Sequence, residues 1–198
     1  MKRIPTAAIL LTLFSHGVLS VGAQTTPATP RPEAFLADIN GDGIPDRIVV
    51  QAGNLAVYVA TSLGVYSTSP VILATSVQGA AVGTFRGVSI NDIAILSTSG
   101  QVYMLVNNGT GVFTPSAAFD TAGATITSTC QLASGNFFNR TSLDLAVVCP
   151  SQPPTVVLGL NDGTGNFQFT AINQQTLAPK MQNFLQNIYG ILQGALHP

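Results

Sequence analysis

The sequence contains three diverged copies of one unit, and this self-similarity limits the chain to a repeat architecture. Asp46, Asp92 and Asp144 mark the same position in each copy, spaced by about 50 residues. A short apolar run follows each Asp, and a second run follows the first before a Gly-containing turn and an aromatic residue. The Asn-Gly and Asp-Gly pairs in the second and third turns supply the positive φ angles that tight hairpins need. Apolar runs of strand length between turns predict an all-β fold over 34–170.

The first copy places an oxygen-bearing side chain at every second position of the loop that leads into its first apolar run. Calcium takes about six to eight oxygen ligands, and this spacing suits a hard cation. Gly43 relieves the steric clash where the loop turns. The predicted ligands are the side chains of Asp38, Asn40 and Asp42, the carbonyl of Ile44 and the carboxylate of Asp46. The alternative is a polar turn rich in Asp and Gly that binds no metal.

An EF-hand is excluded because its loop needs a Glu at the twelfth position, where this chain has Val49, and helices on both sides. With a last Asp that leads into a strand, the loop resembles the calcium-binding loop of FG-GAP/VCBS repeats, the blades of integrin-like β-propellers. The string Asn-Asp-Gly-Thr-Gly-Asn-Phe over 161–167 is typical of the same family. The resemblance covers about 34–170 and implies three propeller-type, four-stranded antiparallel blades.

Only the first copy keeps the set of metal ligands, so we expect one calcium ion rather than three. The matching positions are Thr84, Arg86 and Val88 in the second copy, and Asn136, Phe138 and Arg140 in the third. Each degenerate loop keeps its last Asp and gains an Arg. We therefore expect Arg86 to pair with Asp92 and Arg140 with Asp144, with a fixed guanidinium in place of the cation.

Three blades are fewer than the four to eight of most propellers. Three arrangements remain open: a partial propeller or open arc, a homodimer that gives six blades, and a shortened relative of a longer protein. Open edges and apolar end faces invite association, so the terminal blades need a cover.

The two ends of the chain differ from the repeats in composition. Residues 1–23 have the basic, apolar and small-residue parts of a secretory signal peptide, and 24–33 read as a Pro/Thr-rich linker. Residues 171–198 form a tail that we predict to be an amphipathic helix which caps the last blade or associates with another copy. Its apolar positions are Met181, Phe184, Leu185, Ile188, Leu192 and Leu196. The chain is thus expected to be secreted, extracellular or periplasmic, with no membrane span after cleavage of the signal.

Charge and cysteine usage narrow the choice of partners. The signal peptide removes Lys2 and Arg3, which leaves five Lys and Arg against eight Asp and Glu and makes a nucleic-acid partner improbable. Cys130 and Cys149 flank a hairpin loop at nearly equal distances, so they would face each other across two antiparallel strands. A disulfide fits this geometry and a secreted chain. The alternative is a pair of small buried side chains.

The reactive groups needed for catalysis are nearly absent. His197 is the sole histidine after signal cleavage, and the carboxylates form no obvious catalytic pair. We therefore expect a non-enzymatic, calcium-stabilised module that binds an extracellular protein or glycan, because the family resemblance implies roles in adhesion and in lectins. The second hypothesis is a structural or docking protein of an extracellular assembly, without a small-molecule ligand. The chain has no Trp, and Tyr58, Tyr66 and Tyr103 are expected in the core, which slightly favours protein contact over sugar.

Overall fold

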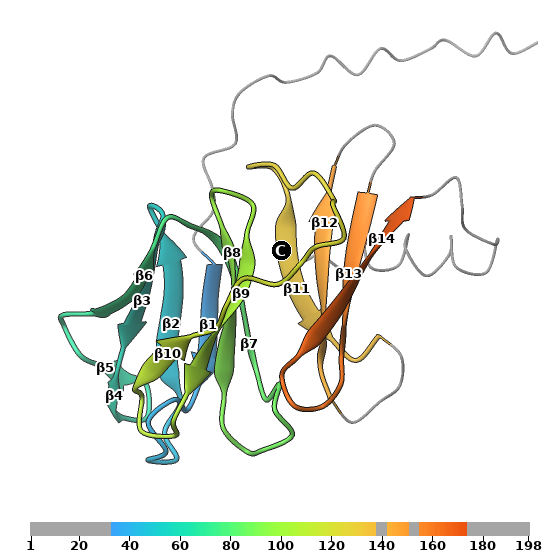
Figure 1. Ribbon diagram of the computed structural model, residues 1–198. Coiled ribbons are helices and arrows are strands. Elements are labelled where there is room, and N and C mark those ends of the chain that lie inside the picture. The colour runs from blue at the N-terminus through green and yellow to red at the C-terminus, as the bar shows by residue number, and fades with distance from the viewer. Residues whose placement is uncertain (1–32, 138–141, 151–154, 174–198) are drawn as a thin grey trace, which may run out of the picture.

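The computed structural model describes residues 33–137, 142–150 and 155–173, and these form three four-stranded antiparallel sheets (Figure 1). Sheet 1 comprises β1 (Glu33–Ala37), β2 (Asp46–Gln51), β3 (Asn54–Tyr58) and β6 (Val71–Thr75). Sheet 2 comprises β7 (Val77–Gly83), β8 (Asp92–Ser97), β9 (Val102–Asn107) and β10 (Phe113–Pro115). Sheet 3 comprises β11 (Gln131–Gly135), β12 (Asp144–Cys149), β13 (Thr155–Asn161) and β14 (Phe167–Asn173). The predicted all-β fold and its three repeated sheets are confirmed.

Each sheet is built from strands that pair in chain order, and the three first strands lie at the centre of the array. β7 contacts both β1 and β11, so the sheets lie side by side along these strands (Figure 1). Sheet 1 differs by a small two-stranded ribbon of β4 (Ala60–Ser62) and β5 (Val65–Tyr66), inserted between β3 and β6. The sequence pattern predicts a simple turn there.

Two apolar cores fill the spaces between the sheets. Ile93 and Ile95 of β8 pack toward sheet 1, and the alternate residues Ala94 and Leu96 pack toward sheet 3. All of β8 is therefore buried. The continuous apolar run of this middle strand follows from burial on both faces rather than one.

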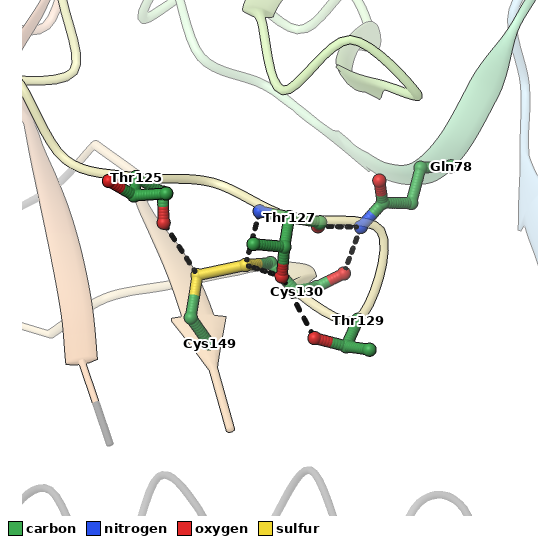
Figure 2. The surroundings of a disulfide bond; sticks show 6 residues. All are labelled: Gln78, Thr125, Thr127, Thr129, Cys130 and Cys149. Carbon is green, nitrogen blue, oxygen red and sulfur yellow. Dashed lines mark hydrogen bonds between the residues drawn. A yellow bond between two sulfur atoms is a disulfide. The ribbon is translucent and has the colours of Figure 1, made fainter. Parts of the chain in front are cut away.

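The disulfide between Cys130 and Cys149 is present, with a Cα–Cα distance of 4.1 Å (Figure 2). Gln131 of β11 faces Val148 of β12, and the cysteines occupy the next facing pair outward. Figure 2 also shows the amide of Gln78, from β7, donating to the carbonyl oxygens of Thr127, at 2.9 Å, and Cys130. The bridge therefore closes the β11–β12 hairpin at the point where sheet 2 contacts it.

The predicted boundaries of the repeats shift slightly. β1 begins at Glu33, which the sequence analysis placed in the linker, and β14 continues to Asn173, into the predicted tail. The proposed signal peptide, the rest of the linker and residues 174–198 of the tail lie outside the described residues, as do Phe138 and Arg140. Among the residues that the structure describes, no helix is long and apolar enough to cross a bilayer.

The three tyrosines expected in the core are only half-buried. Tyr58, Tyr66 and Tyr103 each keep part of the side chain in contact with solvent. A phenol carries a polar end that is best left in water or hydrogen-bonded, so strand position alone overestimated their burial. Arg47 lies over the ring of Tyr58, with its guanidinium carbon 5.0 Å from the ring centroid.

Candidate functional site

The loop between β1 and β2 is held by hydrogen bonds between its own polar side chains and its backbone. Asp38 accepts hydrogen bonds from the amides of Gly41 at 2.7 Å and Gly43 at 2.8 Å. Asn40 accepts one from the amide of Asp42 at 3.0 Å and donates one to its carboxylate at 2.9 Å. Gly41 and Gly43 both have φ of 81°, a conformation that favours glycine. The loop therefore brings Asp38, Asn40 and Asp42 together.

The two remaining predicted ligands are placed differently. Asp42 accepts a hydrogen bond from the amide of Ile44 at 2.8 Å. Asp46 is fully buried, and its two oxygens accept hydrogen bonds from the amides of Ile39 at 3.1 Å and Ala60 at 2.8 Å. These bonds tie the start of β2 to the segments that follow β1 and β3. Both carboxylate oxygens of Asp46 therefore hold backbone at the base of the loop.

The donor set fits a calcium ion in part. Asp38, Asn40 and Asp42 carry five side-chain oxygens, and carboxylate and amide oxygens are the hard ligands that Ca²⁺ takes. Each carboxylate oxygen that accepts one amide hydrogen retains a lone pair for a metal. Within residues 33–137, 142–150 and 155–173, no group of three or more His, Cys, Asp or Glu side chains is gathered at one point. A calcium ion at this loop would therefore need ligands from Asn40 and from backbone carbonyls as well as from carboxylates.

The same loop in sheet 2 holds an ion pair where sheet 1 has the proposed ligands. Arg86 donates from Nε and Nη2 to the carboxylate of Asp92, both at 2.9 Å, and from Nη2 to the carbonyl of Asn107 at 2.6 Å. Hydrogen bonding to Asp92, which is fully buried, raises the pKa of Arg86 above its usual value. The predicted pairing of Arg86 with Asp92 is confirmed.

The corresponding pairing in sheet 3 stays a prediction, because Arg140 lies outside the described residues. Asp144 is fully buried, and its Oδ1 accepts a hydrogen bond from the amide of Asn161 at 3.0 Å. Its Oδ2 is buried without a hydrogen-bond partner among the residues that the structure describes. A donor is therefore needed at this position.

A buried asparagine, which no sequence motif indicates, joins neighbouring sheets. Asn107 donates from its side-chain nitrogen to the carbonyl of Ile39 in sheet 1 at 2.7 Å and to that of Asn91 at 3.0 Å. Its side-chain oxygen accepts hydrogen bonds from the amides of Gly109 at 2.9 Å and Gly111 at 3.3 Å. One side chain thus fixes the β9–β10 turn and anchors it to the metal-loop side of sheet 1. We call this arrangement the asparagine lock.

Sheet 3 repeats the asparagine lock against sheet 2. Asn161 donates to the carbonyls of Phe85 at 2.7 Å and Leu143 at 2.8 Å, and accepts from the amides of Gly163 and Gly165. In sheet 1 the residue whose amide contacts the buried Asp is Ala60, which has no such side chain. In both cases the asparagine donates a hydrogen bond to the sheet that precedes its own in the chain.

The interlocked loops and turns form one polar end of the array, the lower end in Figure 1. A Cβ on Gly41 would come within 2.8 Å of the carbonyl oxygen of Gly109, so the loop of sheet 1 and the turn of sheet 2 are in close contact. Hydrogen bonds from the hydroxyl and amide of Thr164 lower the pKa of Asp162. The exposed polar side chains at this end, which we call the loop end, are Asp42, Asn108, Thr110, Asp162, Thr164 and Asn166.

Comparison with known proteins gives a likeness in fold. No family model matches the chain, and no curated protein matches it. A solved structure of an Agrocybe aegerita lectin, described for its specific recognition of non-reducing terminal N-acetylglucosamine, is similar with a TM-score of 0.51 and 19% identity. The likeness covers 76% of this chain but 40% of the lectin chain. At this identity it shows the fold alone.

Proposed function

We propose that this chain is a secreted, non-catalytic module that binds glycans through its loop end. The observation that carries the proposal is the likeness in fold to a lectin, which extends over 76% of the chain. We also propose that the three sheets are repeats of the FG-GAP/VCBS type. The disulfide supports secretion, because such bonds persist in oxidising compartments.

The loop end has the chemistry that sugar hydroxyls require. Its exposed carboxylates accept hydrogen bonds, its amide side chains both donate and accept them, and its hydroxyls do the same. Hydrogen bonds from Thr164 lower the pKa of Asp162, and hydrogen bonds to an ionised acceptor are stronger than neutral ones. The asparagine lock fixes the turns that carry these groups, so little conformational entropy is lost on binding.

A glycan array, probed with the mature chain 24–198 in calcium and then in chelator, tests this function. We expect binding to glycans with non-reducing terminal sugars, and loss of that binding in Asn108→Ala/Thr110→Ala. A matched control is Thr98→Ala, which alters an exposed polar residue in the turn between β8 and β9, at the opposite end of the sheets. Absence of binding to every glycan in both conditions would refute the proposal.

Docking to a protein is the second candidate, and one feature of sheet 1 favours it. Apolar side chains of β4 to β6 and their connections are exposed: Leu63 at 85%, Val65 at 54%, Val71 at 54% and Ile72 at 50%. Exposed apolar clusters commonly mark contact sites for proteins. If Leu63→Ser/Val65→Ser abolished binding to an extracellular matrix extract while the glycan array stayed negative, this candidate would replace the first.

We further propose that one calcium ion binds at Asp38, Asn40 and Asp42, with the Ile44 carbonyl and Asp46 completing the set. Bound there, calcium supplies positive charge that offsets the repulsion between carboxylates and holds the loop. Asp42→Ala is therefore expected to lower the thermal midpoint of the chain in calcium but not in chelator. Asp162→Ala, which removes a carboxylate from a turn of sheet 3, should have the same effect in both. An equal loss for Asp42→Ala in both conditions would rule out the metal.

A further inference from the structure

The central part of the face of sheet 3 that points away from sheet 2 is apolar and buried. Leu145, Val147 and Val157 belong to the core between sheets 2 and 3, so alternate residues of β12 and β13 point the other way. These are Ala146, Val148, Val156 and Leu158, exposed by 0%, 4%, 6% and 2%. They form two neighbouring cross-strand pairs, with Ala146 facing Leu158 and Val148 facing Val156. We call these four residues the end face.

Neighbouring strands do not account for this burial, because side chains stand roughly perpendicular to a sheet and adjacent strands shield only their flanks. The described residues that pack on the end face are Phe137 and Ile172. The outer face of sheet 1 is more open: its central residues Val49 and Ala56 are buried, but its flanking apolar residues are not, with Leu36 66% and Ile72 50% exposed. Large apolar side chains therefore remain exposed on the outer face of sheet 1, whereas the four apolar residues of the end face are all shielded from water.

We propose that the C-terminal segment 174–198 of the same chain covers the end face and terminates the array. This segment begins directly after β14, whose last residue Asn173 faces Thr155 at the start of β13. Its apolar residues recur at helical spacing from Met181 to Leu196. A helix of that length is about 24 Å long, close to the roughly 20 Å length of a six-residue strand.

The connection is long enough for this placement. Residues 174–180 span up to about 23 Å when extended. Three adjacent strands span only about 10 Å across, from β14 to β12. The segment can therefore lie over the centre of sheet 3 without disturbing β14.

A second copy of the chain fits the end face poorly. A sheet that follows sheet 3 would need an asparagine in the place of Asn107 and Asn161, and sheet 1 has Ala60 there. The outer face of sheet 1 also carries Arg47, which is exposed and lies over Tyr58. Packing that face on the end face would bury a guanidinium among apolar side chains, at a cost of several kcal/mol. A ring closed by two copies is thus disfavoured.

Thiol labelling tests the proposal. Ala146→Cys places a thiol of nearly unchanged volume on the end face, and Ala34→Cys places one at an exposed position of β1 as a control. We expect a maleimide to label Ala146→Cys on the order of 100-fold faster in a chain that ends at residue 173 than in the chain that ends at 198. Ala34→Cys should be labelled at the same rate in both.

Faster labelling of the shortened chain could also result from misfolding, so charge substitutions in the full chain serve as a second test. Phe184→Glu/Leu185→Glu/Ile188→Glu should accelerate labelling of Ala146→Cys, whereas Gln182→Glu/Asn183→Glu/Gln186→Glu should leave it unchanged. Equally slow labelling of both chain lengths would overturn the proposal. So would protection in the full chain that disappears on dilution, because a second copy would then be the cover.

Discussion

Replacement of Asn107 by Ala removes the asparagine lock between sheets 1 and 2. The side chain is 1% exposed and makes four hydrogen bonds, two to the carbonyls of Ile39 and Asn91 and two from the amides of Gly109 and Gly111. Each such bond contributes about 1 kcal/mol net, and water can reach the half-buried glycines to replace part of the loss. We therefore expect Asn107→Ala to lower the free energy of unfolding by about 3 kcal/mol, measured by urea denaturation followed by circular dichroism.

The adjacent residue supplies the control. Asn108 is of the same type and lies in the same turn, but it is exposed and bonds only within the turn, to the amide and hydroxyl of Thr110 and the amide of Val112. Asn108→Ala should cost less than about 1 kcal/mol. If the two substitutions cost the same, the lock between sheets does not stabilise the array and the reasoning is wrong.

Three further substitutions probe other parts of the molecule by the same denaturation assay. Arg86→Met leaves the buried carboxylate of Asp92 without its partner and should cost about 3 kcal/mol, with a smaller loss for Arg86→Lys; an unchanged stability would show that the pair is dispensable. Cys130→Ala/Cys149→Ala opens a loop with a sequence separation of 19 and should cost about 3 kcal/mol, matching the reduced wild type; a stability equal to that of the oxidised protein would contradict this. Glu33→Gln should raise stability at pH 7: burial raises the pKa of Glu33 above its usual 4.5, so the folded state binds the proton more tightly and loses stability as pH rises past 4.5. The gain should vanish below pH 4.5, and a gain that persists there would refute the assignment.

Local patterns were sufficient to predict the sheets. The strands β2, β8 and β12 begin at Asp46, Asp92 and Asp144. A short apolar run between two turns is typical of a buried strand, so these strands could be predicted from the sequence. The pairing of Arg86 with Asp92 and the facing cysteines also followed from short spacings. In each of these cases the interacting residues lie within one hairpin.

The asparagine lock could not be predicted in the same way. Asn107 and Ile39 are 68 residues apart, and Asn161 and Phe85 are 76 apart. An Asn before Asn-Gly or Asp-Gly is expected in any turn, so its long-range role leaves no separate signal. The recurrence of this Asn in the second and third copies was the only indication.

The same argument applies to Asp46. Its place at the end of an oxygen-rich loop predicts a metal ligand, but an Asp also recurs at that position in the two copies that lack the other ligands. The three Asp residues have the same structural role. Asp46, Asp92 and Asp144 accept a hydrogen bond from the backbone amides of Ala60, Asn107 and Asn161, respectively. The recurrence indicates a structural role for Asp46 in addition to its proposed contact with calcium, whereas Asp38, Asn40 and Asp42 are proposed ligands found in the first copy alone.

Chemical-shift mapping of the calcium-loaded chain with N,N′-diacetylchitobiose tests the account most directly. The account predicts saturable shifts concentrated on the amides of the loop end, above all those of Asp42, Asn108 and Thr110, and weaker binding in chelator. Saturable shifts near the Cys130–Cys149 bridge instead, or none at millimolar sugar together with a negative glycan array, would contradict it.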